Sequence, residues 1–143
     1  MAEVRRVSPE EAQALIAGEG YQYLDVRTEA EFAAGHPKGA HNVPFMLAGP
    51  SGMTKNPEFA SVVNAVYPPD AKLVVGCKSG GRSAKAAAEM VGLGFTSVVD
   101  QRAGFDGARN SFGQLVEAGW AEKGLAVETT TPGGSYAEIK VKK

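Results

Sequence analysis

Apolar and polar residues follow two different periods along this chain. Short segments with β-strand character are residues 4–7, 21–26, 39–44, 72–76 and 96–100. Segments with helical character lie between them, at residues 8–18, 29–35, 57–67 and 83–93. Strands that alternate with helices predict an α/β domain with a mainly parallel sheet.

Capping residues mark where the first two helices begin. Ser8 with Glu11, and Thr28 with Glu31, have the spacing of capping boxes, in which a hydroxyl and a carboxylate each accept a backbone N–H. We expect the first helix to end at Gly18, because glycine commonly follows the last turn of a helix.

The remaining segments give weaker signals. We expect residues 45–55 to form a long loop, Asn56 to cap the helix over 57–67, and residues 112–120 to form a helix. Residues 128–143 are interpreted as a polar C-terminal extension to a domain over residues 4–127. That extension is compatible with an edge strand, a protein contact or a flexible end.

Length and composition limit the classes of protein that fit. A chain of 143 residues has room for one domain of ordinary size, and a formal net charge of −1 gives no reason to expect a nucleic-acid or membrane partner. The N-terminus has no apolar run resembling a signal peptide. We therefore expect a soluble, cytoplasmic, single-domain protein.

Cys77 is the only cysteine, and it stands in the stretch VVGCKSGGRSAK. A free cysteine is often only a small buried apolar residue. Here it follows an apolar strand and precedes a helix, so backbone N–H groups of the turn are expected to point toward it. Lys72, Lys78, Arg82 and Lys85 surround it in sequence with no acidic residue in the same stretch, and positive charge favours a reactive thiolate.

Two motif-based alternatives are weaker. The segment GCKSGGRS fits the P-loop pattern except that Arg82 stands where lysine belongs, and a planar guanidinium is not equivalent to an ammonium group. A cysteine phosphatase loop has five residues between cysteine and arginine, whereas four separate Cys77 from Arg82. The shorter loop suits a sulfur atom better than a phosphoryl group.

Four segments in order, YLDVR, EFAAGHPKGAHNVP, CKSGGRS and LGFTSVVDQRAGF, resemble the single-domain rhodanese family over residues 4 to about 126. The resemblance implies a rhodanese-like α/β fold with a mainly parallel five-stranded sheet flanked by helices on both faces. It also implies a sulfurtransferase that takes sulfane sulfur from a small anionic donor such as thiosulfate, with a thiol, a protein or cyanide as acceptor, and that needs no metal or organic cofactor.

The same resemblance assigns roles to individual residues. Cys77 would carry the sulfur as a persulfide. The loop around it would bind the substrate and stabilise the persulfide anion with its N–H groups, and its residues are Lys78, Ser79, Gly80, Gly81, Arg82 and Ser83. The alternative from another class is a sulfur-carrier, sensing or protein-interaction module on the same fold.

Three residues outside the loop are expected to support it. Asp25 and Arg27 match the D-x-R segment at a strand end, where Asp25 is expected to bond backbone N–H groups. Arg82 either contacts the substrate or closes the loop by pairing with a carboxylate, for which Glu31 is the candidate. His36 and His41 lack further ligands at a recognisable spacing, so no metal site is predicted.

Overall fold

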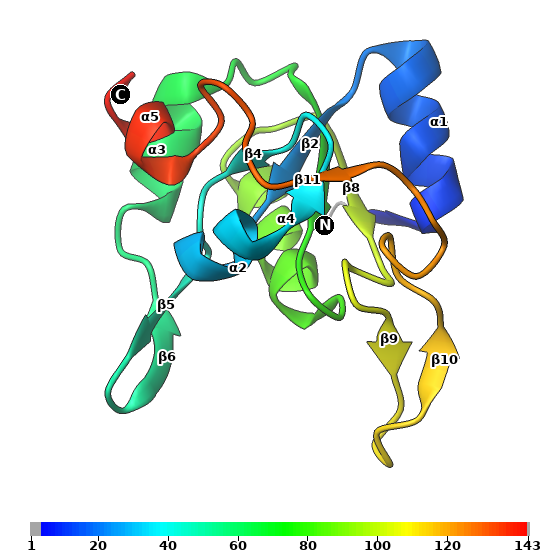
Figure 1. Ribbon diagram of the computed structural model, residues 1–143. Helices are drawn as coiled ribbons and strands as arrows, with labels where there is room; N and C mark the ends of the chain where they lie inside the picture. Colours follow the sequence, from blue (N-terminus) through cyan, green and yellow to red (C-terminus); the bar gives the residue numbers. More distant parts are fainter. Residues whose placement is uncertain (1–3, 143) are drawn as a thin grey trace.

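A five-stranded sheet forms the centre of the structure, a computed structural model that describes residues 4–142 (Figure 1). Its strands are β1 (Arg5–Val7), β2 (Gln22–Asp25), β4 (His41–Asn42), β7 (Lys72–Gly76) and β8 (Ser97–Gln101). They stand in the order β1-β8-β7-β2-β4, and every neighbouring pair is parallel. The predicted α/β class with a mainly parallel five-stranded sheet is confirmed.

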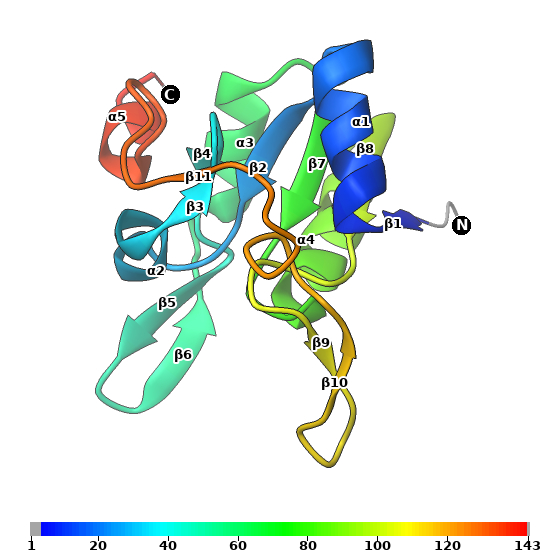
Figure 2. The same ribbon diagram turned by 45° about the vertical axis from the view of Figure 1, so that its right-hand side comes forward.

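Helices cover both faces of the sheet (Figure 2). The helices are α1 (Pro9–Glu19), α2 (Glu29–Ala34), α3 (Phe59–Val66), α4 (Gly81–Gly92) and α5 (Tyr136–Lys140). The side chains of β7 point alternately to the two faces of the sheet, since successive residues of a strand point to opposite sides. Val74 packs in a cluster with Leu15 of α1, whereas Val75 packs in a second cluster with Val62 of α3 and Met90 of α4. The core is therefore divided by the sheet into two layers.

Both predicted capping boxes are present. The Ser8 hydroxyl accepts the Glu11 N–H at the start of α1, and the Thr28 hydroxyl accepts the Glu31 N–H at the start of α2. The predicted end of the first helix at Gly18 is wrong, because α1 continues to its C-cap, Gly20. Gly20 has the positive φ of 75° that a left-handed cap requires, so it ends the helix more effectively than the earlier glycine.

Two expectations for the middle of the chain also need correction. Residues 45–55 form an antiparallel hairpin of β5 (Met46–Gly49) and β6 (Gly52–Lys55) in place of the expected long loop. Asn56 is not the N-cap of α3, which begins at Phe59 with Glu58 as its cap residue. The Asn56 side chain instead accepts the Glu58 N–H, so it fixes the turn that leads into the helix.

The helix predicted over residues 112–120 is wrong. This part of the chain belongs to a hairpin of β9 (Ala108–Arg109) and β10 (Leu115–Glu117). Gly113 has a φ of +77°, which a helix does not accommodate. Gly119 packs so closely on the backbone of Gly107 that a Cβ at residue 119 would overlap it. These two glycines favour a turn and a close chain crossing over a continuous helix.

The C-terminal segment packs against the rest of the domain. Strand β11 (Val127–Glu128) pairs antiparallel with β3 (His36–Pro37), and α5 follows it. Tyr136 and Ile139 of α5 are buried in the same cluster as α3. Within residues 4–142, no helix is long and apolar enough to cross a membrane.

Candidate active site

Cys77 lies directly beyond the carboxyl end of β7, at the edge where ligands bind in parallel α/β sheets. Its side chain is almost fully buried, with 2% exposure. The N–H of Gly80 donates to Sγ at 3.1 Å, and α4 begins at the next residue. Gly80 has a φ of +98°, and a Cβ there would overlap the carbonyl oxygen of Arg102. Glycine at this position therefore lets the turn close over the thiol.

Ser83 completes the inner surroundings of the sulfur. Its hydroxyl is fully buried on the first turn of α4 and accepts the thiol hydrogen of Cys77 at 3.5 Å. The same hydroxyl donates to the carbonyl oxygen of Gly80 at 3.3 Å. Lys78 and Ser79 are exposed on the outside of the loop. The thiol thus has one backbone donor and one hydroxyl as close polar neighbours, while the wider ring of donors from Lys78 to Ser83 stays a prediction.

A second segment of the chain holds the back of the loop. The N–H of Phe105 donates to the carbonyl oxygen of Cys77 at 2.7 Å, and the N–H of Asp106 donates to that of Lys78 at 2.9 Å. Gly104 has a φ of +68°, and a Cβ there would overlap the carbonyl oxygen of Lys78. The segment after β8 is thereby fastened to the first turn of the cysteine loop.

Arg82 and Glu31 form a two-pronged ion pair across the site. The distances are 2.7 Å from Nη1 to Oε1 and 3.1 Å from Nη2 to Oε2. Burial alone would raise the pKa of Glu31, but hydrogen bonds from Arg82 and from Thr28 outweigh it and lower the pKa to about 2. Glu31 serves its capping box and this pair together, so α2 and α4 are linked beside the cysteine loop.

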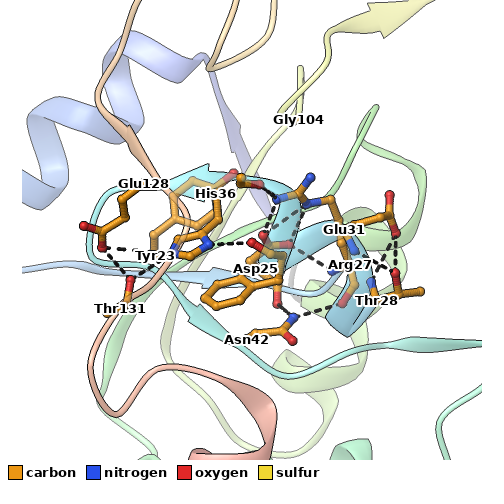
Figure 3. A network of polar contacts seen from close by, with 12 residues as sticks. Tyr23, Asp25, Arg27, Thr28, Glu31, His36, Asn42, Gly104, Glu128 and Thr131 are labelled. Carbon is orange, nitrogen blue, oxygen red and sulfur yellow. Dashed lines mark hydrogen bonds and ion pairs between the residues drawn. The ribbon is translucent and has the colours of Figure 1, made fainter.

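Asp25 and Arg27 form a second, buried pair at the end of β2 (Figure 3). Asp25 accepts the Arg27 N–H at 2.9 Å, and its Oδ2 accepts Nη2 of Arg27 at 2.7 Å. Nη2 also donates to the carbonyl oxygen of Gly35, and the guanidinium lies 4.4 Å from the centre of the Phe105 ring. Burial would lower the pKa of Arg27, but the hydrogen bonds to Asp25 and its negative charge outweigh the effect of burial and raise that pKa. Arg27 therefore stays charged.

A cavity of about 250 Å³ opens beside the loop. Its walls combine two cations, two carboxylates and apolar or backbone surface, contributed by Arg27, Glu31, Ala34, Gly35, Lys78, Phe105 and Asp106. Lys78 is the exposed cation at this cavity and has no ion-pair partner among residues 4–142. The cavity brings Arg27, Glu31 and Lys78 together from the segment after β2, from α2 and from the cysteine loop.

The positive charge around the thiol is smaller than the sequence suggested. Lys72 begins β7, so it lies at the opposite end of the strand from Cys77 and donates to the carbonyl oxygen of Glu19. Arg82 is neutralised by Glu31, and Lys85 is exposed on α4. The sequence pattern counted these cations together because it could not show which end of each element they occupy.

Tyr23 is a site neighbour that the sequence did not reveal. Its side chain is buried and packs edge-on against Trp120, with ring centroids 5.3 Å apart. A Cβ at Gly76, the residue before Cys77, would overlap the Tyr23 hydroxyl. A larger residue therefore has no room directly before the cysteine.

The two histidines lie in separate places. His36 is fully buried, stacked on Phe32, with its Nδ1 2.7 Å from the Phe32 carbonyl oxygen and its Nε2 2.9 Å from the Thr131 hydroxyl. His41 pairs with the Tyr67 hydroxyl at 3.0 Å. Within residues 4–142, no cluster of three or more His, Cys, Asp or Glu side chains has the arrangement of a metal site.

Comparison with known proteins identifies the family of this chain. The model of the family described as "Rhodanese-like domain" matches residues 8–111, and the chain belongs to this family. It is 41% identical over 129 residues to "Thiosulfate sulfurtransferase 16, chloroplastic" of Arabidopsis thaliana, covering 87% of this chain and 97% of the relative. It is 45% identical over 100 residues to "Senescence-associated protein DIN1" of Raphanus sativus, covering 70% of this chain and 52% of that protein.

The fold is also found among solved structures. The crystal structure of Rv0390 from M. tuberculosis superposes with a TM-score of 0.72 at 25% identity, covering 90% of this chain and 100% of that chain. This chain therefore has the rhodanese fold and spans about half the length of the radish relative.

Proposed function

We propose that this protein is a sulfurtransferase that carries sulfane sulfur from an anionic donor such as thiosulfate to a nucleophilic acceptor as a persulfide on Cys77. The observation that carries the proposal is the position of the thiol. Its Sγ lies beyond the carboxyl end of β7 and accepts the Gly80 N–H at 3.1 Å, directly before α4 begins. A donor at this place stabilises negative charge on sulfur.

The reaction needs two displacements at sulfur. The Cys77 thiolate attacks the outer sulfur of thiosulfate, the sulfur–sulfur bond of the donor breaks, and sulfite leaves with the bonding electrons. A thiolate or cyanide then attacks the outer sulfur of the persulfide, and the Cys77 thiolate leaves. Each step forms one bond to sulfur and breaks another, so the cycle returns the enzyme without a further oxidant or reductant.

The charged groups at the cavity have different roles in this proposal. Lys78 is exposed there and attracts the anionic donor, whereas Arg82 is held by Glu31 and so supports the loop. Asp25 fixes Arg27, whose guanidinium lines the same cavity. Direct contact between Arg82 and a donor would require the pair with Glu31 to open. The cytoplasmic location stays a prediction.

A test of the proposal is formation of thiocyanate from thiosulfate and cyanide by the purified protein. We expect turnover by the wild type, none by Cys77→Ser, and a raised KM for thiosulfate in Lys78→Gln, since it loses the exposed cation. Lys85→Gln removes another exposed lysine, on the helix that follows, and serves as the matched control. Absence of thiocyanate with the wild type would favour the sulfur-carrier or interaction module instead.

A further inference from the structure

A second cavity, of about 260 Å³, lies where α2, β4 and the C-terminal segment meet. Its walls come from α2, from Asn42 of β4, from residues 129–131 after β11 and from the start of α5. Helices α2 and α5 stand at the β4 edge of the sheet (Figure 2). Thr129 and Thr130 are exposed, so the cavity is open to small molecules from the solvent.

Helix α2 separates this cavity from the one beside the cysteine loop. Glu29, Phe32 and Ala33 line the second cavity and have the i, i+3, i+4 spacing of one helix face. Glu31 and Ala34 of the same helix line the cavity beside the loop. The second cavity is therefore distinct from the site of the proposed sulfur transfer.

Asn42 has a buried polar atom without a partner at this cavity. Its side chain has no exposed surface, and the residue is part of the cavity wall. Nδ2 donates to the carbonyl oxygens of Asp25 and Arg27, each at 2.9 Å, and these two acceptors fix which end of the amide is oxygen (Figure 3). Oδ1 accepts no hydrogen bond from residues 4–142. A buried amide oxygen without a donor is costly, and a ligand that supplies an N–H or O–H removes this cost.

The charged groups of the wall are acceptors too. Glu29 is exposed on the first turn of α2, and Glu138 belongs to α5. Hydrogen bonds from Ser135 and Gly133 lower the pKa of Glu138, so this carboxylate is ionised at neutral pH. Among residues 4–142, these two carboxylates are the charged side chains that line the cavity. An amide oxygen and two carboxylates together favour a cation that donates hydrogen bonds.

Basic side chains on the neighbouring segments have other partners. Lys140 lies 5.0 Å from the centre of the Tyr136 ring, and Lys142 reaches the carbonyl oxygen of Gly133 at 3.5 Å. The imidazole of His36 is bonded at both nitrogens, as described above. These three groups are not part of the cavity wall. The wall itself therefore keeps its negative charge.

The size and the apolar surface of the cavity limit the ligand further. At about 30 Å³ for each molecule of liquid water, a volume of about 260 Å³ corresponds to roughly nine waters. A ligand of fewer than about ten non-hydrogen atoms fits this space. Phe32, Ala33 and Tyr136 add apolar wall that suits a short hydrocarbon chain.

We propose that this cavity binds a small primary alkylammonium ion. One of its N–H groups donates to Oδ1 of Asn42, and its charge is balanced by Glu29 and Glu138. Its hydrocarbon chain packs on Phe32 and Tyr136. The inference goes beyond the proposed function and does not depend on the thiol of Cys77.

The test is an NMR titration of the full chain at pH 7 with n-butylamine, which is an ammonium ion at this pH. The resonances followed are the backbone amides and the side-chain amide of Asn42. We expect saturable shifts at Asn42 and along α2, with a dissociation constant in the millimolar range for so small a ligand. n-Butanol and butyrate have the same chain length but no positive charge, and each is expected to bind at least about tenfold more weakly.

Two pairs of variants locate the site. Ala33→Leu fills the cavity from an exposed helix position and is expected to abolish the shifts. Ala30→Leu, exposed on the same helix and outside the cavity wall, is its control and leaves them unchanged. Glu29→Gln is expected to weaken binding about twofold to fivefold, since it removes one exposed charge. Glu19→Gln, exposed at the end of α1, is the control for this change.

Absence of saturable shifts in the wild type overturns the inference. Equal binding of n-butanol overturns it too, because that result reports an apolar cavity without charge recognition. Unchanged binding in Ala33→Leu places the amine elsewhere and has the same consequence. Cys77→Ser is expected to bind n-butylamine as the wild type does, so this result and the sulfurtransferase assay can fail separately.

A further ligand distinguishes two sources of the ammonium group. Nα-acetyl-lysine methylamide carries the same ammonium on a peptide unit. If it binds as tightly as n-butylamine, the cavity takes a lysine side chain of another protein. If it does not bind, the cavity takes a free amine.

Discussion

The guanidinium of Arg82 and the carboxylate of Glu31 are joined by two hydrogen bonds of 2.7 and 3.1 Å beside the cysteine loop. The pair connects α4 to α2, and through the Thr28 capping box to the end of β2. Arg82 is therefore part of the support of the loop.

Glu31→Gln is expected to lower the melting temperature near neutral pH, with a loss of about 1 kcal/mol for a partly exposed pair. Glutamine keeps the capping box but cannot pair with Arg82. The pKa of Glu31 is lowered from 4.5 to about 2 in the folded state, so the stabilisation is present above about pH 4.5 and is lost as the pH falls toward 2. Melting curves of both proteins at pH 7 and pH 2 should differ at pH 7 and converge at pH 2. An equal difference at both values would contradict this role.

Gly80→Ala is expected to abolish most of the sulfurtransferase activity. The substitution places a Cβ against the carbonyl oxygen of Arg102 at a φ of +98°, so the N–H that faces Sγ must move. Gly81→Ala is the matched control, because a Cβ at that neighbouring residue meets no atom within 4 Å. Thiocyanate formation by the two variants compares them directly, and equal activity would mean that the Gly80 turn does not hold the site.

Gly76→Ala is expected to destabilise the fold by about 1–3 kcal/mol, because its Cβ overlaps the buried Tyr23 hydroxyl. Tyr23→Phe in the same chain removes that hydroxyl and should recover part of the loss. Gly18→Ala, in an open position of α1, is expected to stabilise slightly, by about 0.5–1 kcal/mol. Urea unfolding gives the free energy of unfolding of each variant. If the effects of Gly76→Ala and Tyr23→Phe simply add, the contact between these two residues is contradicted.

Ile139→Ala tests whether α5 is an integral part of the core. Its side chain has no exposed surface, so truncation is expected to cost about 2–4 kcal/mol. Val141→Ala, at a side chain with 80% exposure, should change the free energy of unfolding by less than about 0.5 kcal/mol. A cost at Ile139 as small as at Val141 would mean that the C-terminal segment is independent of the domain.

Local signals in the sequence predicted much of this fold. The capping boxes at Ser8 and Thr28 depend on residues three apart, so neighbours in the chain are sufficient to identify them. The apolar run of β7 and the turn after it likewise placed Cys77 at the carboxyl edge of a parallel sheet. The family resemblance then supplied the sheet as a whole.

Contacts between distant residues account for what the sequence did not predict. The residues of 112–120 include good helix formers, but Gly113 and Gly119 take part in a turn and a crossing that only the tertiary structure reveals. The burial of Asp100 and its ion pair with Arg6 join residues far apart in sequence, so neighbouring residues do not reveal them. The pairing of Arg82 with Glu31, by contrast, is one of the alternatives that the sequence offered, and the structure contains it.

The central claim is that Cys77 holds transferred sulfur, and intact-mass measurement after incubation with thiosulfate tests it most directly. The account predicts that the wild type gains one sulfur atom, that cyanide removes it, and that Cys77→Ser gains none. A wild type that never gains sulfur, or a Cys77→Ser protein that gains it equally, would contradict the account.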